Sequence, residues 1–242
     1  MGIALSSLVA CVDSVEEPVD AVELTSARYE TTWVLDGVTL RQGGGWTVTA
    51  DTGTVVTVDT GYLVNYQASL VPCVDLRPSL DEQIGSTSQY AHGDVPDPSA
   101  TPTPLLEKLA NPGATELADI TMVADRYCGA HYLIARGNLD TVPLPADVLM
   151  IGRTLYLSGS YQQPGEEHAT PFVVDTDLAH ARLDTLDALD VMGEGNHAEV
   201  VIRRDLARMF DGVEFDTGGE QERALQILAN ITGHARLVVT LF

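Results

Sequence analysis

The sequence is poor in basic residues. It contains 13 lysine and arginine residues, of which Lys108 is the sole lysine, against 35 aspartate and glutamate residues, and its formal net charge is −22. A surface of this charge repels phosphate backbones and anionic lipid headgroups. The charge therefore argues against nucleic-acid binding and against electrostatic attachment to a membrane. The negative charge is compatible with binding of cationic partners, including divalent metal ions.

Long apolar runs are also missing, because no stretch approaches the roughly 20 apolar residues that span a bilayer. At the N-terminus, Leu8-Val9-Ala10-Cys11 instead looks like a bacterial lipobox, whose cysteine is acylated after cleavage. The match to a secretory signal is incomplete, since no basic residue precedes Cys11 and the apolar stretch is short, and a chance match is the alternative. We expect residues 1–19 to hold a signal remnant, the lipobox and an acidic spacer. Any membrane link then runs through lipid on Cys11.

Cysteine is scarce, with three residues in the chain. If Cys11 carries lipid, Cys73 and Cys128 remain as an even pair in an exported protein, and a disulfide between them is the expected state. In the entropic model, closing the loop between Cys73 and Cys128 stabilises the folded chain by about 4 kcal/mol. In a cytosolic protein the same two thiols would be free.

The common catalytic and metal-binding motifs are absent. The sequence has no G-x-S-x-G nucleophile elbow, no glycine-rich loop ending in G-K-[ST], no H-E-x-x-H and no C-x-x-C. Asp175-Thr176-Asp177 offers oxygens to calcium, but the glycine and glutamate of an EF-hand are missing. We interpret the acidic residues 175–190 as a solvated loop or helix face. No spacing singles out a carboxylate pair for glycoside hydrolysis, so no catalytic residue is predicted.

A β-type pattern dominates what is present. Tyr62, Val64 and Tyr66, followed by Ala68 and Leu70, alternate with polar residues, as in a half-buried strand. Similar segments predict strands over residues 20–34, 38–42, 46–51, 54–73, 119–137, 147–163, 170–177 and 197–205.

Between these segments, residues 75–118 are rich in Pro, Ser, Thr and Asp and predict a long loop with one short helical candidate at 104–110. Helical periodicity occurs at residues 206–210 and 220–237, where Ala224, Leu225, Ile227 and Leu228 form an expected apolar stripe. The sequence predicts a single mainly β domain over residues 20–242. We expect an antiparallel β-sandwich or a barrel-like domain, with a long loop at about 75–118 and a C-terminal helix.

The segment YCGAHY places a thiol and an imidazole three residues apart. In an extended chain, Tyr127, Gly129 and His131 share one face, whereas Cys128 and Ala130 share the other. Cys128 and His131 then point in opposite directions, and a joint chelate would need a turn. We therefore assign Cys128 to the disulfide and His131 to a separate environment.

A metal site around His131 is one hypothesis. His92, His168 and His197 lie beside acidic or glycine-rich turns, and imidazole with carboxylate suits copper or zinc better than calcium. We take His131 as the leading candidate ligand, with help from His92, His168 or His197. Because their spacings match no known ligand pattern, the ligands would converge from separate loops. The alternative is that His131 is a hydrogen-bonded structural residue.

Four stretches, LVAC, WTVTADTGTVVTVDTGYLVNYQASLVPC, YCGAHY and LYLSGSY, resemble a group of bacterial cell-envelope lipoproteins with a β-rich domain. The resemblance covers residues 8–11, 46–73 and 127–161. It implies export, a lipid anchor and a disulfide from Cys73 to Cys128, and it implies little about activity. A looser similarity to periplasmic copper-binding β proteins is limited by the low content of cysteine, tryptophan and histidine.

Three functions stay open. We favour a non-enzymatic, lipid-anchored binding protein on the periplasmic or outer-surface side of the bacterial cell envelope, with a transition metal bound through histidines. The second is a structural or interaction protein of the cell surface that takes protein partners and no metal. The third is an exported hydrolase that uses acidic residues.

Overall fold

The computed structural model describes residues 24–73, 97–191 and 197–242. Cys11, His92 and the expected signal remnant over residues 1–19 lie outside the described residues. The strands in chain order are β1 (Leu24–Val34), β2 (Val38–Leu40), β3 (Trp46–Thr49), β4 (Val55–Pro72), β5 (Leu105–Lys108), β6 (Thr115–Val123), β7 (Asp125–Ile134), β8 (Leu155–Gln162), β9 (Thr170–Thr176), β10 (His180–Val191), β11 (His197–Asp205) and β12 (Arg236–Leu241). The helices are the short 3₁₀ helix η1 (Leu206–Arg208) and α1 (Glu220–Gly233).

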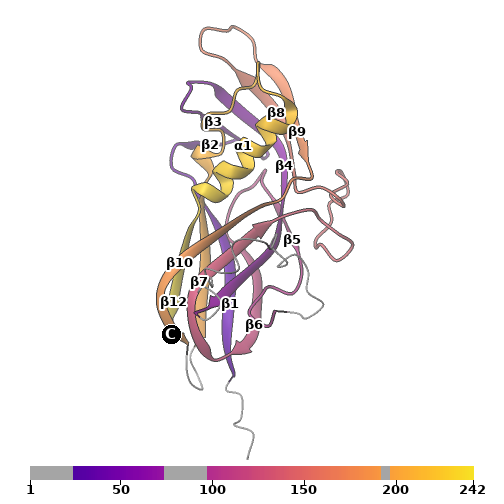
Figure 1. Cartoon of the computed structure of the whole chain (residues 1–242). Coiled ribbons are helices and arrows are strands. Elements are labelled where there is room, and N and C mark those ends of the chain that lie inside the picture. The colour runs from indigo at the N-terminus through magenta and orange to yellow at the C-terminus, as the bar shows by residue number, and fades with distance from the viewer. Residues whose placement is uncertain (1–23, 74–96, 192–196) are drawn as a thin grey trace, which may run out of the picture.

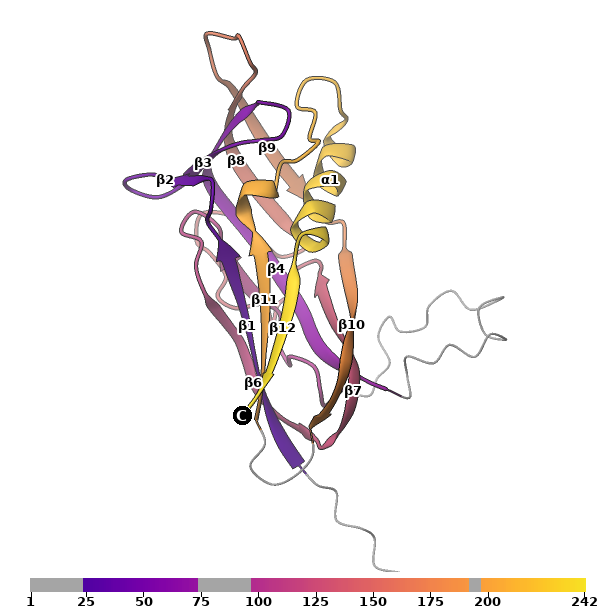
Figure 2. The same ribbon diagram turned by 90° about the vertical axis from the view of Figure 1, so that its left-hand side faces the viewer.

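Two sheets make up the fold, as the mainly β prediction requires. The small sheet has the order β12-β11-β1-β6, and the large sheet has the order β10-β7-β4-β3-β2, with β5 and β8 also paired to β4 and β9 paired to β8. Among the described residues, every pair of neighbouring strands is antiparallel except β1 with β11. The small sheet packs on the half of the large sheet that contains β7 and β10, which gives a sandwich of two open sheets (Figure 2).

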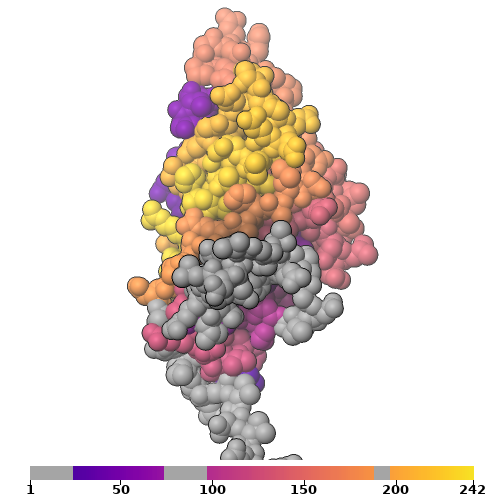
Figure 3. All heavy atoms as spheres, in the orientation of Figure 1, coloured from indigo at the N-terminus to yellow at the C-terminus, as the bar shows by residue number. Residues whose placement is uncertain are grey.

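The other half of the large sheet is covered by α1 (Figures 1 and 3). The helix buries Ala224, Ile227, Leu228 and Ile231, which recur at the spacing of one helical face. Leu225, which we expected in this stripe, is exposed because it lies about 100° away from that face. A single core cluster runs under both the helix and the small sheet.

The C-terminal end of α1 is tied to β10. Nη1 of Arg182 donates hydrogen bonds to the carbonyl oxygens of Thr232 at 3.0 Å and Gly233 at 2.6 Å. A cation at this end complements the helix dipole and occupies carbonyls that have no partner within the helix. The contact fixes α1 against the edge strand of the large sheet.

The long strand β4 changes face twice. Its pairing register shifts between Val58 and Thr60 and again between Asn65 and Gln67. A β-bulge inserts one residue, and the residues beyond it then project from the opposite face. Tyr62 and Val64 therefore lie in a separate small cluster, whereas residues on either side of them enter the main core. The prediction that Tyr62, Val64, Ala68 and Leu70 share one face is wrong for this reason.

Four expected features of the chain also differ from the structure. Residues 104–110, the short helical candidate, instead contain the strand β5. The four residues of β5 are too few for their pattern to distinguish a helix from a strand. With β6 beginning at Thr115, the expected loop does not extend to residue 118. Most of the acidic segment 175–190 is the strand β10, and β12 occupies residues expected to end the helix.

The disulfide prediction is confirmed. Cys73 and Cys128 are bonded, with their Cα atoms 4.7 Å apart, and the bond joins the ends of β4 and β7. A register shift beside Cys128 turns Tyr127 into the core, so Tyr127 does not share the face of His131 as expected. None of the described helices is long and apolar enough to cross a membrane.

Candidate functional site

His131 lies on the outer side of the large sheet, on β7, which is next to the edge strand β10. On β7 it is paired with Ser69 of β4 and Leu183 of β10, while its neighbours Ala130 and Tyr132 enter the core. Burial lowers the pKa of His131 below its ordinary value of 6.5, and the carboxylate of Asp97 partly opposes that shift. A neutral imidazole is the form that binds metals.

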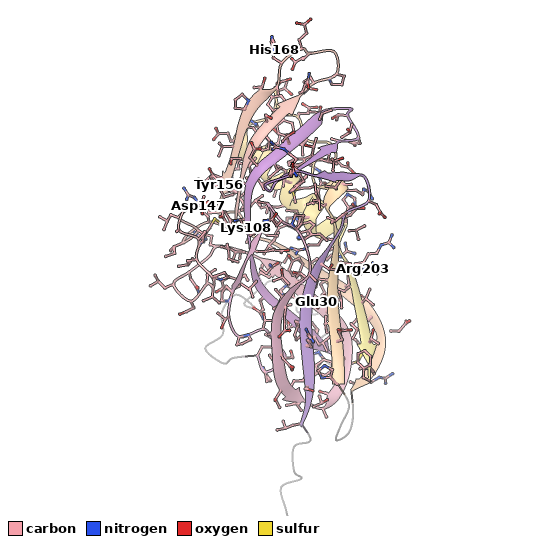
Figure 4. The ribbon with its side chains drawn as sticks, turned by 180° about the vertical axis from the view of Figure 1, so that it is seen from behind. Glu30, Lys108, Asp147, Tyr156, His168 and Arg203 are labelled. Atoms are coloured by element: carbon pink, nitrogen blue, oxygen red, sulfur yellow. A yellow bond between two sulfur atoms is a disulfide. The ribbon has the colours of Figure 1, made fainter. Side chains whose placement is uncertain are left out.

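The other predicted ligands lie elsewhere. His197 projects from the outer side of the small sheet, where its Nδ1 is 2.7 Å from Oγ of Ser26. His168 lies in the connection between β8 and β9, at the far tip of the molecule (Figure 4). Within residues 24–73, 97–191 and 197–242, no three His, Cys, Asp or Glu side chains group closely enough to hold a metal ion. His92 lies outside these ranges, so a site that combines it with His131 stays a prediction.

A buried polar network joins the two sheets. Nη1 of Arg204 on β11 donates to Oδ1 of Asn65 at 3.2 Å and to the hydroxyl oxygen of Tyr132 at 3.0 Å. Nη2 of Arg204 donates to Oε2 of Glu107 at 2.5 Å, and Nδ2 of Asn65 donates to the same oxygen at 3.1 Å. Nε1 of Trp33 donates to the second carboxylate oxygen of Glu107. Side chains from five strands therefore meet at the carboxylate of Glu107 and the guanidinium of Arg204.

Electrostatics hold this network in its charged form. Burial alone lowers the pKa of Arg204, but the Glu107 carboxylate and the Tyr132 hydroxyl together more than offset this effect, and the pKa lies above its ordinary value. Burial raises the pKa of the Tyr132 hydroxyl to about 12, so Tyr132 remains a donor. All five side chains are at most 5% exposed. The arrangement is a clamp between the sheets, out of reach of a solute.

This network was not predicted from the sequence, although one signal was available. Arg204 continues the alternation of the buried residues Ala198, Val200 and Ile202 along β11. An arginine at a core position requires a buried partner, because an unpaired buried charge is costly. The position of the partner, Glu107 on β5, is set by the pairing of β4 with β5 and is not encoded locally.

An apolar surface lies on the connection between β7 and β8. We call residues 137–152 the apolar loop. Leu139 is 82% exposed and Leu149 is 68% exposed. The exposed large hydrophobic residues of this loop are Leu139, Val142, Leu144, Leu149 and Ile151. Contiguous exposed apolar side chains commonly mark an interaction site.

The apolar loop is held in a fixed shape. Val142 pairs with Leu105, with its amide donating to Pro104 and its carbonyl accepting from Leu106. The hydroxyl of Tyr62 donates to both carboxylate oxygens of Asp147, at 2.8 and 3.1 Å. Met150 packs beneath the loop with Tyr62, Val64 and Leu106. Figure 4 shows Asp147 beside Lys108 and Tyr156 on this side of the molecule.

A shallow hollow of about 400 Å³ lies between the N-terminal end of α1 and the end of β9. Asp175, Asp177 and Glu220 line it together with Arg153. Arg153 pairs with Asp175 at 2.7 Å, and Arg136 lies 3.6 Å from Asp177. Each of the two aspartates considered for calcium therefore already has an arginine partner.

No family model matches the sequence, and no curated protein matches it. Among solved structures, MbnP from Methylosinus trichosporium is similar to this chain with a TM-score of 0.38 and 10% sequence identity. The match covers 91% of this chain and 99% of that protein. These values are too low to support a conclusion about fold or function.

Proposed function

We propose that this chain is an exported, non-enzymatic protein of the bacterial cell envelope that binds a partner protein through the apolar loop. The observation that carries the proposal is the exposure of Leu139 and Leu149 on a loop whose backbone is fixed by hydrogen bonds. A preformed apolar surface loses little conformational entropy when a partner covers it. The second function considered from the sequence, an interaction protein, fits this feature best.

Export is supported by the disulfide between Cys73 and Cys128, since disulfides persist in oxidising compartments. The lipobox at residues 8–11 adds a lipid anchor on Cys11 to the proposal. Mass spectrometry of the native N-terminus tests the anchor. A diacylated Cys11 at the N-terminus is expected, and an unmodified residue ahead of an intact Cys11 would exclude it.

The net charge of the chain restricts the kind of partner surface that the apolar loop would bind. With a net charge of −22, the protein attracts cationic surfaces and repels anionic ones. Two arginines near the apolar loop, Arg136 and Arg153, are engaged by aspartates, and the loop itself carries the exposed carboxylates of Asp140 and Asp147. The proposed partner therefore presents apolar side chains within a basic rim.

The test places a photo-cross-linking amino acid at position 149 in cells that make the protein. Position 225 on α1 is the control, because Leu225 is a single exposed leucine outside the loop. We expect one product of defined mass at position 149 and none at position 225. The purified cross-linked partner should then bind the Leu139→Ser/Leu149→Ser variant at least about tenfold more weakly, as for loss of a central apolar anchor. Equal binding by wild type and variant would exclude the loop as the docking site.

A second candidate function is transition-metal binding through His131. It is favoured by the neutral imidazole and by the carboxylate of Asp97, which acts on it electrostatically. Calorimetric titration with copper and zinc salts should show one site in the wild type and none in His131→Ala. His168→Ala, altered at the far tip, is the matched control. Equal metal binding by wild type and His131→Ala would remove this candidate.

A further inference from the structure

A neutral face rich in hydroxyl groups lies on the outer side of the large sheet, opposite α1. Its side chains form three rows across β2, β3, β4, β8 and β9, which follow from the strand registers. The rows are Thr39-Thr47-Thr57-Ser160-Pro171, Thr49-Val55-Gln162 and Thr60-Ser158-Val173. We call these residues the hydroxyl face.

The direction of these side chains follows from their neighbours. Val48, Val56, Leu157 and Phe172 alternate with members of the hydroxyl face and are buried in the core beneath α1. Successive residues of a strand point to opposite sides of the sheet. The hydroxyl face therefore points away from α1, and its members are half-exposed or exposed. Figure 4 shows the molecule from this side, with α1 behind the strands.

This face carries no formal charge, in contrast to the rest of the chain. One residue in five of the whole sequence is charged, and the net charge is −22, yet every residue of the three rows is neutral. Asp59, which borders the rows, pairs with Arg41, and Asp175 at the lower border pairs with Arg153 at 2.7 Å. Depletion of charged residues is the compositional mark of the centre of an interface.

The hydroxyl groups are available for a ligand. Oγ1 of Thr47 and Oγ1 of Thr57 are 3.1 Å apart and share one hydrogen bond. The hydroxyl groups of Ser158 and Ser160 have no hydrogen-bond partner in the described part of the chain, so each can both donate and accept. Threonine methyl groups, Val55, Val173 and Pro171 supply apolar contact between them.

We propose that the hydroxyl face binds a neutral polysaccharide. An apolar partner would leave the serine and threonine hydroxyls unpaired, and a charged partner would lose hydration without gaining a counter-charge. A neutral polysaccharide offers hydroxyl groups that exchange hydrogen bonds with the rows, and C–H surfaces that contact the methyl groups.

The experiment incubates the full chain with insoluble cellulose, chitin and β-1,3-glucan and measures protein left in solution. Wild type should be retained by at least one of the three. Ser160→Asp places a charge in the central row and should weaken retention by about tenfold or more, given the cost of an unpaired charge at a contact. Thr32→Asp is the matched control, because Thr32 is half-exposed on the outer side of a central strand in the small sheet.

Val173→Asp supplies a second variant in case Ser160→Asp does not fold, since Val173 is 55% exposed on the edge strand β9. It should lose retention while keeping the wild-type circular dichroism spectrum. Lack of retention on all three polysaccharides, or equal retention by wild type and Val173→Asp, would overturn the proposal. A doubled mass in sedimentation that Val173→Asp abolishes would instead assign the face to a second copy. Leu149→Ser should keep full retention, which separates this proposal from that for the apolar loop.

Discussion

The guanidinium of Arg204 and the carboxylate of Glu107 meet inside the sandwich, with Nη2 2.5 Å from Oε2. Arg204 is 0% exposed and Glu107 is 3% exposed. The guanidinium carbon also lies 4.1 Å from the centre of the Trp33 ring, whose indole nitrogen donates to Glu107. Since Arg204 and Trp33 belong to the small sheet and Glu107 to the large one, the pair fixes how the two sheets sit on each other.

Removal of Arg204 alone should be severely destabilising. In Arg204→Met the carboxylate of Glu107 stays buried without its cation, and loss of one partner from a buried pair costs about 3–5 kcal/mol. Urea unfolding followed by tryptophan fluorescence measures the change. The double variant Arg204→Met/Glu107→Leu should recover part of the loss, because no charge is left unpaired. A double variant as unstable as the sum of both single variants would contradict this account.

Loss of the disulfide should act mainly on the unfolded chain. The bond joins residues 55 positions apart, and closure of such a loop is worth about 4 kcal/mol in the entropic model. The Cys73→Ser/Cys128→Ser variant should lose about this amount in urea unfolding. Reductant should lower the stability of the wild type to the level of the variant and leave the variant unchanged. A wild type insensitive to reductant would show that the two thiols are not bonded in solution.

The mainly β fold was predictable because the alternation of side chains is a local property. In β1 and β11 the buried residues follow every second position, and the same pattern is visible in the sequence. The two face changes of β4 were not predictable, since a bulge depends on pairing with β7 and β8. An alternation of apolar residues that predicts one continuous face can therefore belong to two separate apolar clusters in the structure.

The candidate sites depended still more on tertiary structure. Apolar residues such as Leu149 and Ile151 were assigned to a strand because apolar residues are usually buried, whereas the structure exposes them. The hydroxyl face combines residues from five strands, and only the registers align Thr47, Thr57 and Ser160 in one row. Local sequence patterns indicate which way a side chain points but not which strands become neighbours.

His131 should make the protein less stable in mild acid. Burial holds its pKa below 6.5 in the folded state, so the unfolded chain binds the proton more readily. Protonation of His131 leaves the free energy of unfolding unchanged above about pH 6.5 and lowers it as the pH falls below that value. In His131→Gln, the decrease in unfolding free energy between about pH 7.5 and pH 5 should be smaller than in the wild type. Leu133→Gln, on the same face, should keep the full pH dependence; an equal change in both variants would exclude His131 as the source.

Tyr62 should control the shape of the apolar loop. Its hydroxyl donates to both oxygens of Asp147, and burial together with this carboxylate raises the pKa of Tyr62 to about 12. Tyr62→Phe removes the donor, and hydrogen bonds to charged groups are worth about 1.5–3 kcal/mol.

Local opening of residues 137–152 should then become more frequent, with faster thermolysin cleavage at Leu149 located by mass spectrometry. Tyr156→Phe is the matched control, because the Tyr156 hydroxyl has no hydrogen-bond partner in the described residues, and it should keep the wild-type rate. If Tyr62→Phe is cleaved no faster within the apolar loop than the wild type, the hydrogen bonds to Asp147 do not hold the loop. Its preformed shape must then come from the backbone bonds of Val142 and from packing on Met150.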